Sequence, residues 1–112
     1  MMANSSRLVP KVSALKLSEL QDRKPVKVTI NGEDLCVTRI GDEVFAIDDT
    51  CTHSDASLSE GDVTDYKIEC WLHGAEFDLR TGAALTLPAN IAVNTYPVKI
   101  VNDLVEVQFT SK

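Results

Sequence analysis

The chain has 112 residues, 44% of them hydrophobic, which is enough for one domain with a modest core and too little for two. Lys and Arg total 11 against 17 Asp and Glu, and the formal net charge of −6 argues against nucleic-acid binding through a basic face. No stretch approaches the roughly 18 to 20 consecutive apolar residues of a membrane-spanning helix, so we expect neither a nucleic-acid partner nor a membrane.

The N-terminal residues are polar and end in Pro10. We expect residues 1–10 to form a flexible tail and residues 11–112 to form a single domain. The tail has neither the apolar core of a signal peptide nor a twin arginine, so a cytoplasmic location is expected. Three cysteines in an intracellular chain make a poor disulfide scaffold, and metal binding is the better interpretation.

The first half of the chain predicts three strands. Apolar and polar residues alternate over residues 26–30, and a second run follows Asn31-Gly32 at residues 35–40, which is typical of a tight hairpin. A turn at residues 41–43 precedes a third strand at residues 44–47. Residues 18–21 could form one helical turn, and residues 48–65 are polar and irregular.

The second half predicts further hairpins. Residues 66–69 and 76–79 read as one pair of strands, and residues 96–101 and 104–109 as another, with a turn at Asn102-Asp103. The segment 87–90 interrupts the pattern, and no window of 12 or more residues has a helical period. About eight or nine short strands predict an all-β fold, a small antiparallel β-sandwich of two packed sheets.

Two short motifs hold the candidate metal ligands. Cys51-Thr52-His53 is a C-x-H motif and Cys70-Trp71-Leu72-His73 is a C-x2-H motif, and together they contain both histidines of the chain. A lone cysteine or histidine is more often a packed or surface residue. Four such residues in two loop-like segments favour a shared metal site at Cys51, His53, Cys70 and His73.

The order of the donors bears on which metal group is bound. A structural zinc module takes the same four donors, but typical fingers present a pair of cysteines and then a pair of histidines. Here each loop offers one of each. If the loops face each other, both cysteines can bind one iron and both histidines the other, so the pattern favours a [2Fe–2S] cluster of the Rieske type over zinc.

These motifs, together with Gly74 and the run Phe77-Asp78-Leu79-Arg80-Thr81-Gly82, resemble the Rieske ferredoxins of bacterial ring-hydroxylating dioxygenase systems. The resemblance covers most of the chain and implies a sandwich like that of the Rieske iron–sulfur proteins. It places two cluster-binding loops at one end, shielded by a third loop at Leu87-Pro88-Ala89. It also implies one [2Fe–2S] cluster, held by the four residues above.

The function that the resemblance implies is one-electron transfer, with no catalytic residues in this chain. A flavin-dependent reductase would supply the electron, and a terminal oxygenase or other redox acceptor would receive it. We expect a monomer. The alternatives are a Rieske-like component of a nitrite reductase or cluster-assembly pathway, and a structural zinc-binding interaction module.

The sequence departs from high-potential members of the family, where two further cysteines bridge the ligand loops. Ala56 and Leu72 replace them, so packing must hold the loops together. Cys36 lies mid-strand and is interpreted as a small buried hydrophobe. Trp71 could belong to a docking surface or to the core. The acidic residues Asp48-Asp49 and Glu60-Gly61-Asp62 are interpreted as solvated loop, although they could also steer a basic partner.

Overall fold

The computed structural model describes residues 11–30, 32–52, 56–72, 74–86 and 91–108, so the expected tail at residues 1–10 lies outside the described part. Strands dominate it, and the all-β prediction is confirmed. The elements are β1 (Lys11–Lys16), η2 (Leu17–Glu19), β2 (Val26–Ile30), β3 (Glu33–Ile40), β4 (Glu43–Asp48), η3 (Leu58–Glu60), β5 (Asp62–Thr64), β6 (Lys67–Glu69), β7 (Glu76–Asp78), β8 (Thr95–Tyr96), β9 (Val98–Val101) and β10 (Leu104–Gln108), where η marks a short 3-10 helix.

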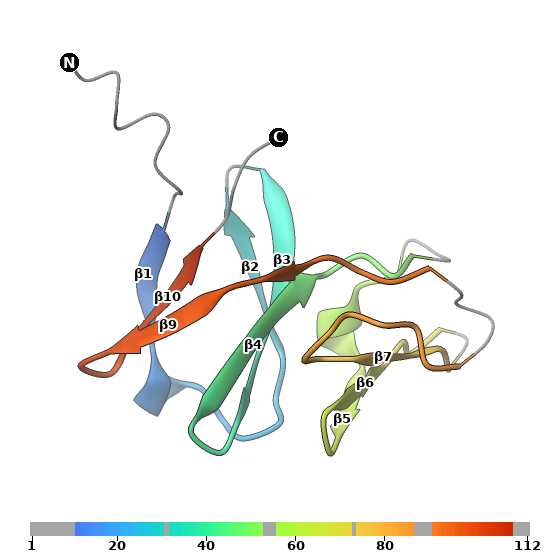
Figure 1. Ribbon diagram of the computed structural model, residues 1–112, viewed down its shortest axis with the longest axis horizontal. Coiled ribbons are helices and arrows are strands. Elements are labelled where there is room, and N and C mark those ends of the chain that lie inside the picture. Colours follow the sequence, from blue (N-terminus) through green and yellow to red (C-terminus); the bar gives the residue numbers. More distant parts are fainter. Residues whose placement is uncertain (1–10, 31, 53–55, 73, 87–90, 109–112) are drawn as a thin grey trace.

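The strands form three antiparallel sheets, ordered β1-β10-β9, β2-β3-β4-β8 and β5-β6-β7. In Figure 1 the strands β2, β3 and β4 run through the middle of the molecule, with β1 and β10 to the left and β5, β6 and β7 to the right. The sheets β1-β10-β9 and β2-β3-β4-β8 form the expected sandwich. The third sheet, which the sequence did not separate from them, carries the second candidate ligand loop.

In the central sheet β2-β3-β4-β8, the strands β3 and β4 have buried side chains on both faces. Because side chains alternate across a strand, β3 directs Leu35 and Val37 into one core cluster and Cys36 into another, and all three are completely buried. The first cluster lies between the sheets β1-β10-β9 and β2-β3-β4-β8. Its buried members are Leu20, Ile30, Leu35, Val37, Val44, Ala46, Val105 and Val107.

The second cluster joins the central sheet to the small sheet and to the candidate ligand loops. It therefore positions the site, and we call it the site core. Its buried members are Cys36, Ile40, Ile47, Cys51, Ala56, Leu58, Ile68, Cys70, Ala75, Phe77, Leu79 and Val93.

The predicted turn at Asn102-Asp103 is confirmed. Both residues have positive φ, at 51° and 70°, the combination that a two-residue hairpin turn of type I′ requires. The turn is also tied to η2, because the Asp103 carboxylate accepts hydrogen bonds from the Ser18 backbone N–H (3.0 Å) and hydroxyl (2.8 Å). The predicted helical turn at residues 18–21 is thus present, displaced to Leu17–Glu19.

Three strand assignments differ from the sequence prediction. β1 was not predicted, because its pairing with β10 shifts register between Val12 and Leu15 and so breaks the alternation of side chains. β5 is only three residues long and lies in the stretch interpreted as irregular. The predicted strand 96–101 is divided at Pro97, where the chain leaves the central sheet after β8 and joins β10 through β9.

No helix among the described residues is long and apolar enough to span a membrane.

Substituting Gly82 with alanine should destabilise the fold. Gly82 has φ +78°, and a Cβ at this position would collide with the backbone oxygen of Val93. Gly41→Ala is the matched control, because its φ is +62° but nothing lies within 4 Å of the added Cβ. We expect G82A to lower the free energy of unfolding by about 3 kcal/mol and G41A by about 1 kcal/mol. Equal losses in denaturant titrations would contradict the close approach.

Candidate metal centre

The two cysteine-bearing loops are closed by similar backbone contacts. Residues 51–56 lie between the bridged pair Thr50 and Ser57, and residues 70–75 lie between the paired Glu69 and Glu76. In each loop the cysteine backbone N–H donates to the carbonyl oxygen five residues later, from Cys51 to Ala56 (3.0 Å) and from Cys70 to Ala75 (2.7 Å). The chain therefore presents each cysteine at the same point of a similarly closed loop.

Both loops deliver their cysteines into the site core. Cys51 is 2% exposed and Cys70 is fully buried. Apolar neighbours in the same cluster, including Leu58 and Phe77, restrict the access of water. The segments that follow β4 and β6 run toward the same end of the molecule, on the right in Figure 1. Two sheltered thiols at one end fit the sulfur donors of an iron–sulfur cluster.

His53 and His73 lie outside the described residues, as does the predicted shielding segment at residues 87–90. Within the described part of the chain, no three His, Cys, Asp or Glu side chains gather as they would around a single metal ion. The structure thus places the two predicted sulfur donors, Cys51 and Cys70, in one buried cluster. The assignment of all four residues as cluster ligands remains a prediction from the sequence.

The rim of this end is apolar. Trp71 is 54% exposed, and Leu72, Leu85 and Ile91 are exposed as well. The Thr52 hydroxyl donates to the Ile91 carbonyl oxygen (2.7 Å), which connects the first cysteine loop to the segment that leads into β8. Of the two interpretations of Trp71, the structure supports a surface position rather than the core. We call Trp71, Leu72, Leu85 and Ile91 the apolar rim.

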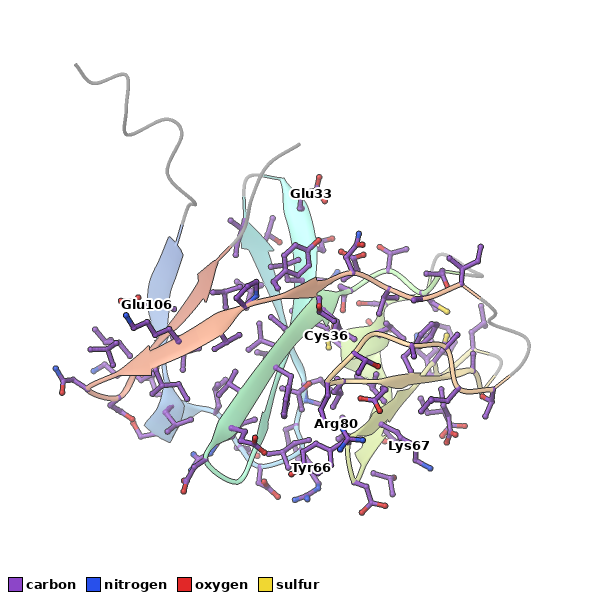
Figure 2. All side chains as sticks on the ribbon, in the orientation of Figure 1. Glu33, Cys36, Tyr66, Lys67, Arg80 and Glu106 are labelled. Carbon is purple, nitrogen blue, oxygen red and sulfur yellow. The ribbon has the colours of Figure 1, made fainter. Side chains whose placement is uncertain are left out.

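Cys36 is confirmed as a buried strand residue. It lies on β3, and its Sγ is 3.9 Å from the Thr38 hydroxyl (Figure 2). Burial raises the pKa of its thiol to about 12, an effect that the Thr38 hydrogen bond opposes and the negative charge of Asp49 reinforces. A thiol with this pKa stays protonated at neutral pH, as expected for a structural cysteine.

The interpretation of Asp48-Asp49 as solvated loop is wrong. Asp49 is only 2% exposed. Half-buried Asp48 accepts hydrogen bonds from the Asn94 backbone N–H (3.0 Å) and the Tyr96 hydroxyl (2.6 Å). Burial, and then the hydrogen bond to Asp48, raise the pKa of Tyr96 above its usual range. No sequence signal marks these contacts, because their partners lie up to 48 residues away.

Glu60 and Asp62 are exposed, as expected of a solvated loop. Because they follow the first cysteine loop in the chain, they add negative charge near that end without belonging to the buried site.

The profile of the Rieske [2Fe-2S] domain matches residues 11–97. The chain belongs to the Rieske [2Fe-2S] family. Its cofactor is one [2Fe–2S] cluster, which sets aside the zinc alternative. Cys51 and Cys70 are buried cysteines, a residue type that binds such clusters. The matched residues include both cysteine loops and the whole of the central sheet.

Relatives of this Rieske protein are ferredoxins. The ferredoxin component of the naphthalene 1,2-dioxygenase system of Pseudomonas putida is 38% identical over 91 residues, which are 81% of this chain and 88% of the relative. The ferredoxin of carbazole 1,9a-dioxygenase from Nocardioides aromaticivorans IC177 is similar in structure, with a TM-score of 0.87 and 33% identity over 89% of this chain and 98% of the other. A protein of this kind carries electrons and is not itself an enzyme.

A further solved structure contains such a ferredoxin with its partner. It is a complex of reduced oxygenase and oxidized ferredoxin in carbazole 1,9a-dioxygenase, and the matched chain has a TM-score of 0.86 and 33% identity, covering 91% of this chain and 95% of that one.

The raised pKa of Cys36 makes its reactivity dependent on pH and on folding. In the folded protein we expect iodoacetamide to leave Cys36 unmodified at pH 8, and unfolding to expose it. Because the pKa of Cys36 is raised in the folded state, the neutral thiol's contribution to the free energy of unfolding is complete below the unfolded pKa of about 9 and is lost as the pH rises toward 12.

Peptide mass mapping after treatment with iodoacetamide measures the modification of Cys36. Modification of Cys36 in the folded protein at pH 8 would contradict the prediction.

Proposed function

We propose that this Rieske protein is the one-electron carrier of a ring-hydroxylating dioxygenase system. It would accept an electron from a flavin-dependent reductase and pass it to a terminal oxygenase. The observation that carries this proposal is the convergence of Cys51 and Cys70, on two similarly closed loops, in one buried core of a Rieske-family chain. A cluster bound there would supply one-electron redox chemistry.

We propose Cys51 and Cys70 as the ligands of one iron and His53 and His73 as those of the other. The described part of the site supports this division, because both cysteines are sheltered in the site core while Leu72, beside His73, is exposed. Neutral imidazole ligands leave the oxidised centre less negative than four thiolates would, so it accepts an electron more readily than an all-cysteine cluster does. The chain therefore holds the two cysteines, the proposed sulfur ligands, in an apolar environment.

Buried side chains and main-chain hydrogen bonds shape the surroundings of the two cysteines. Phe77 and Ala75 are fully buried and carry no hydrogen-bonding group in their side chains, so they exclude water from the sulfur donors. The backbone N–H groups of Cys51 and Cys70 are used to close their own loops. Main-chain hydrogen bonds and packing thus contribute to the geometry of the loops, and no disulfide joins them.

We propose the apolar rim as the surface that docks the oxygenase. Trp71 is exposed beside other exposed apolar residues, and tryptophan is enriched where the binding energy of protein interfaces concentrates. The net charge of −6 favours association with a basic patch around the acceptor site. The ferredoxin–oxygenase complex of carbazole 1,9a-dioxygenase supports an oxygenase as this partner.

The reductase, a monomeric state and a cytoplasmic location belong to the same proposal. A monomeric carrier of this size can leave one partner and dock with the next through a single surface. Similarity to dioxygenase ferredoxins favours this role over the nitrite-reductase and cluster-assembly alternatives.

The ligand set is tested by metal content and by electron paramagnetic resonance. We expect about two iron and two sulfide per chain in protein prepared without oxygen, with a reduced-state signal of mixed His and Cys ligation. Cys70→Ala should abolish the cluster, while the matched variant Cys36→Ala should retain it, because Cys36 has Thr38 as its polar contact. Zinc in place of iron, or loss of the cluster in C36A, would reject the assignment.

The docking surface is tested in a reconstituted assay of reductase, carrier and oxygenase. We expect Trp71→Ala to raise the KM of the oxygenase for the carrier about tenfold, with the midpoint potential unchanged, because a large apolar contact is lost only in the complex. Ile100→Ala is the control, since Ile100 is exposed on β9, outside the apolar rim. Equal effects of the two variants would contradict docking at the rim, and turnover undiminished without the carrier would reject the function.

A further inference from the structure

The two cysteine loops are supported in different ways. The second loop extends from the β6–β7 ladder, in which three residue pairs, ending at Glu69 and Glu76, hold its base. The first loop has one isolated bridge, between Thr50 and Ser57. Directly after Ser57 the chain enters η3 at Leu58, so no second strand continues that pairing. Something else must hold the base of the first loop.

The carboxylate of Asp49 occupies this position. It lies two residues before Cys51, and it accepts a hydrogen bond from the Ser57 hydroxyl through Oδ2 and one from the Ser59 backbone N–H through Oδ1 (2.8 Å). Its own backbone carbonyl accepts from the Leu58 N–H (2.6 Å). One residue thus bonds to three consecutive residues on the opposite side of the loop.

The burial and pairing of Asp49 support a specific role. Its side chain is 3% exposed, and Lys27 Nζ lies 3.9 Å from Oδ2. A buried carboxylate is costly unless hydrogen bonds and an opposite charge compensate it, and here both oxygens have partners. An apolar residue would avoid this cost, so the carboxylate is present for the bonds it makes.

We propose that Asp49 is the positioning residue of the first cysteine loop, replacing with side-chain hydrogen bonds the ladder that the second loop has in its backbone. This rests on the proposed role of Cys51 as a ligand. The cysteines Cys36, Cys51 and Cys70 form no disulfide, so none joins the two loops. The hold of the first loop on its iron therefore depends on Asp49.

The experiment compares Asp49→Ala with a matched carboxylate elsewhere. The Asp78 carboxylate also accepts from two backbone N–H groups, those of Arg80 (2.7 Å) and Thr81 (3.3 Å), and pairs with the Arg80 guanidinium (3.1 Å). Its side chain is 15% exposed. Asp78 lies at the end of β7 away from Ala75, where Arg80 covers the Tyr66 ring at 4.5 Å (Figure 2). Asp78→Ala should weaken the fold without loosening the first loop.

Iron release to a chelator is measured in the loaded proteins, at a temperature where every variant is folded. We expect D49A to release iron about tenfold faster than wild type and D78A less than about twofold faster. Asp49→Asn, which keeps an oxygen for the Ser59 N–H and an amide for the Ser57 hydroxyl, should recover much of the difference. Release from D49A at the wild-type rate, or at the rate of D78A, would overturn the proposal.

Two further measurements keep the test decisive. If D49A does not fold, Ser57→Ala removes one of the two side-chain bonds and should accelerate release about threefold, whereas no acceleration would overturn the proposal. If wild-type protein forms no cluster, the ligand assignment fails, and hydrogen exchange decides the role of Asp49 without metal. Faster exchange of the Leu58 and Ser59 amides in D49A than in D78A supports it, and equal exchange overturns it.

Discussion

Burial of strand β3 on both of its faces is the constraint on which the rest of the structure depends. Successive residues of β3, from Leu35 to Thr38, are all fully buried, so this strand contributes to both core clusters at once. One face closes the sandwich with β1, β10 and β9. The small sheet and both cysteine loops pack against the other face, to which Cys36 contributes a neutral thiol.

At the site, the two similarly closed cysteine loops pack against that face of the central sheet. Each loop presents its cysteine through a main-chain bond that spans five residues, and apolar neighbours keep water from the sulfur atoms. The outer side of the same end carries exposed apolar residues, among them Trp71. Buried cysteines inside and an apolar surface outside are compatible with electron transfer to another protein, because a partner must come close to the redox centre of its carrier.

Acidic residues divide into two groups with different physical roles. Glu60 and Asp62 are exposed and contribute to the net charge that an encountering partner meets. Asp48 and Asp49 turn inward at the end of β4, where they bind the segment leading into β8 and the base of the first cysteine loop. Composition counts all four equally, but burial gives only the second pair a structural task.

The sequence by itself determined the features that depend on local pattern. Alternation predicted β2, β3 and β4, the Asn102-Asp103 pair predicted its turn, and the mixed motifs at Cys51 and Cys70 predicted the cysteine loops and the family. Only the tertiary structure decided the third sheet, the bulged β1, the break at Pro97 and the burial of Asp49. These features arise from contacts between residues far apart in the chain, and no local pattern of residues encodes such contacts.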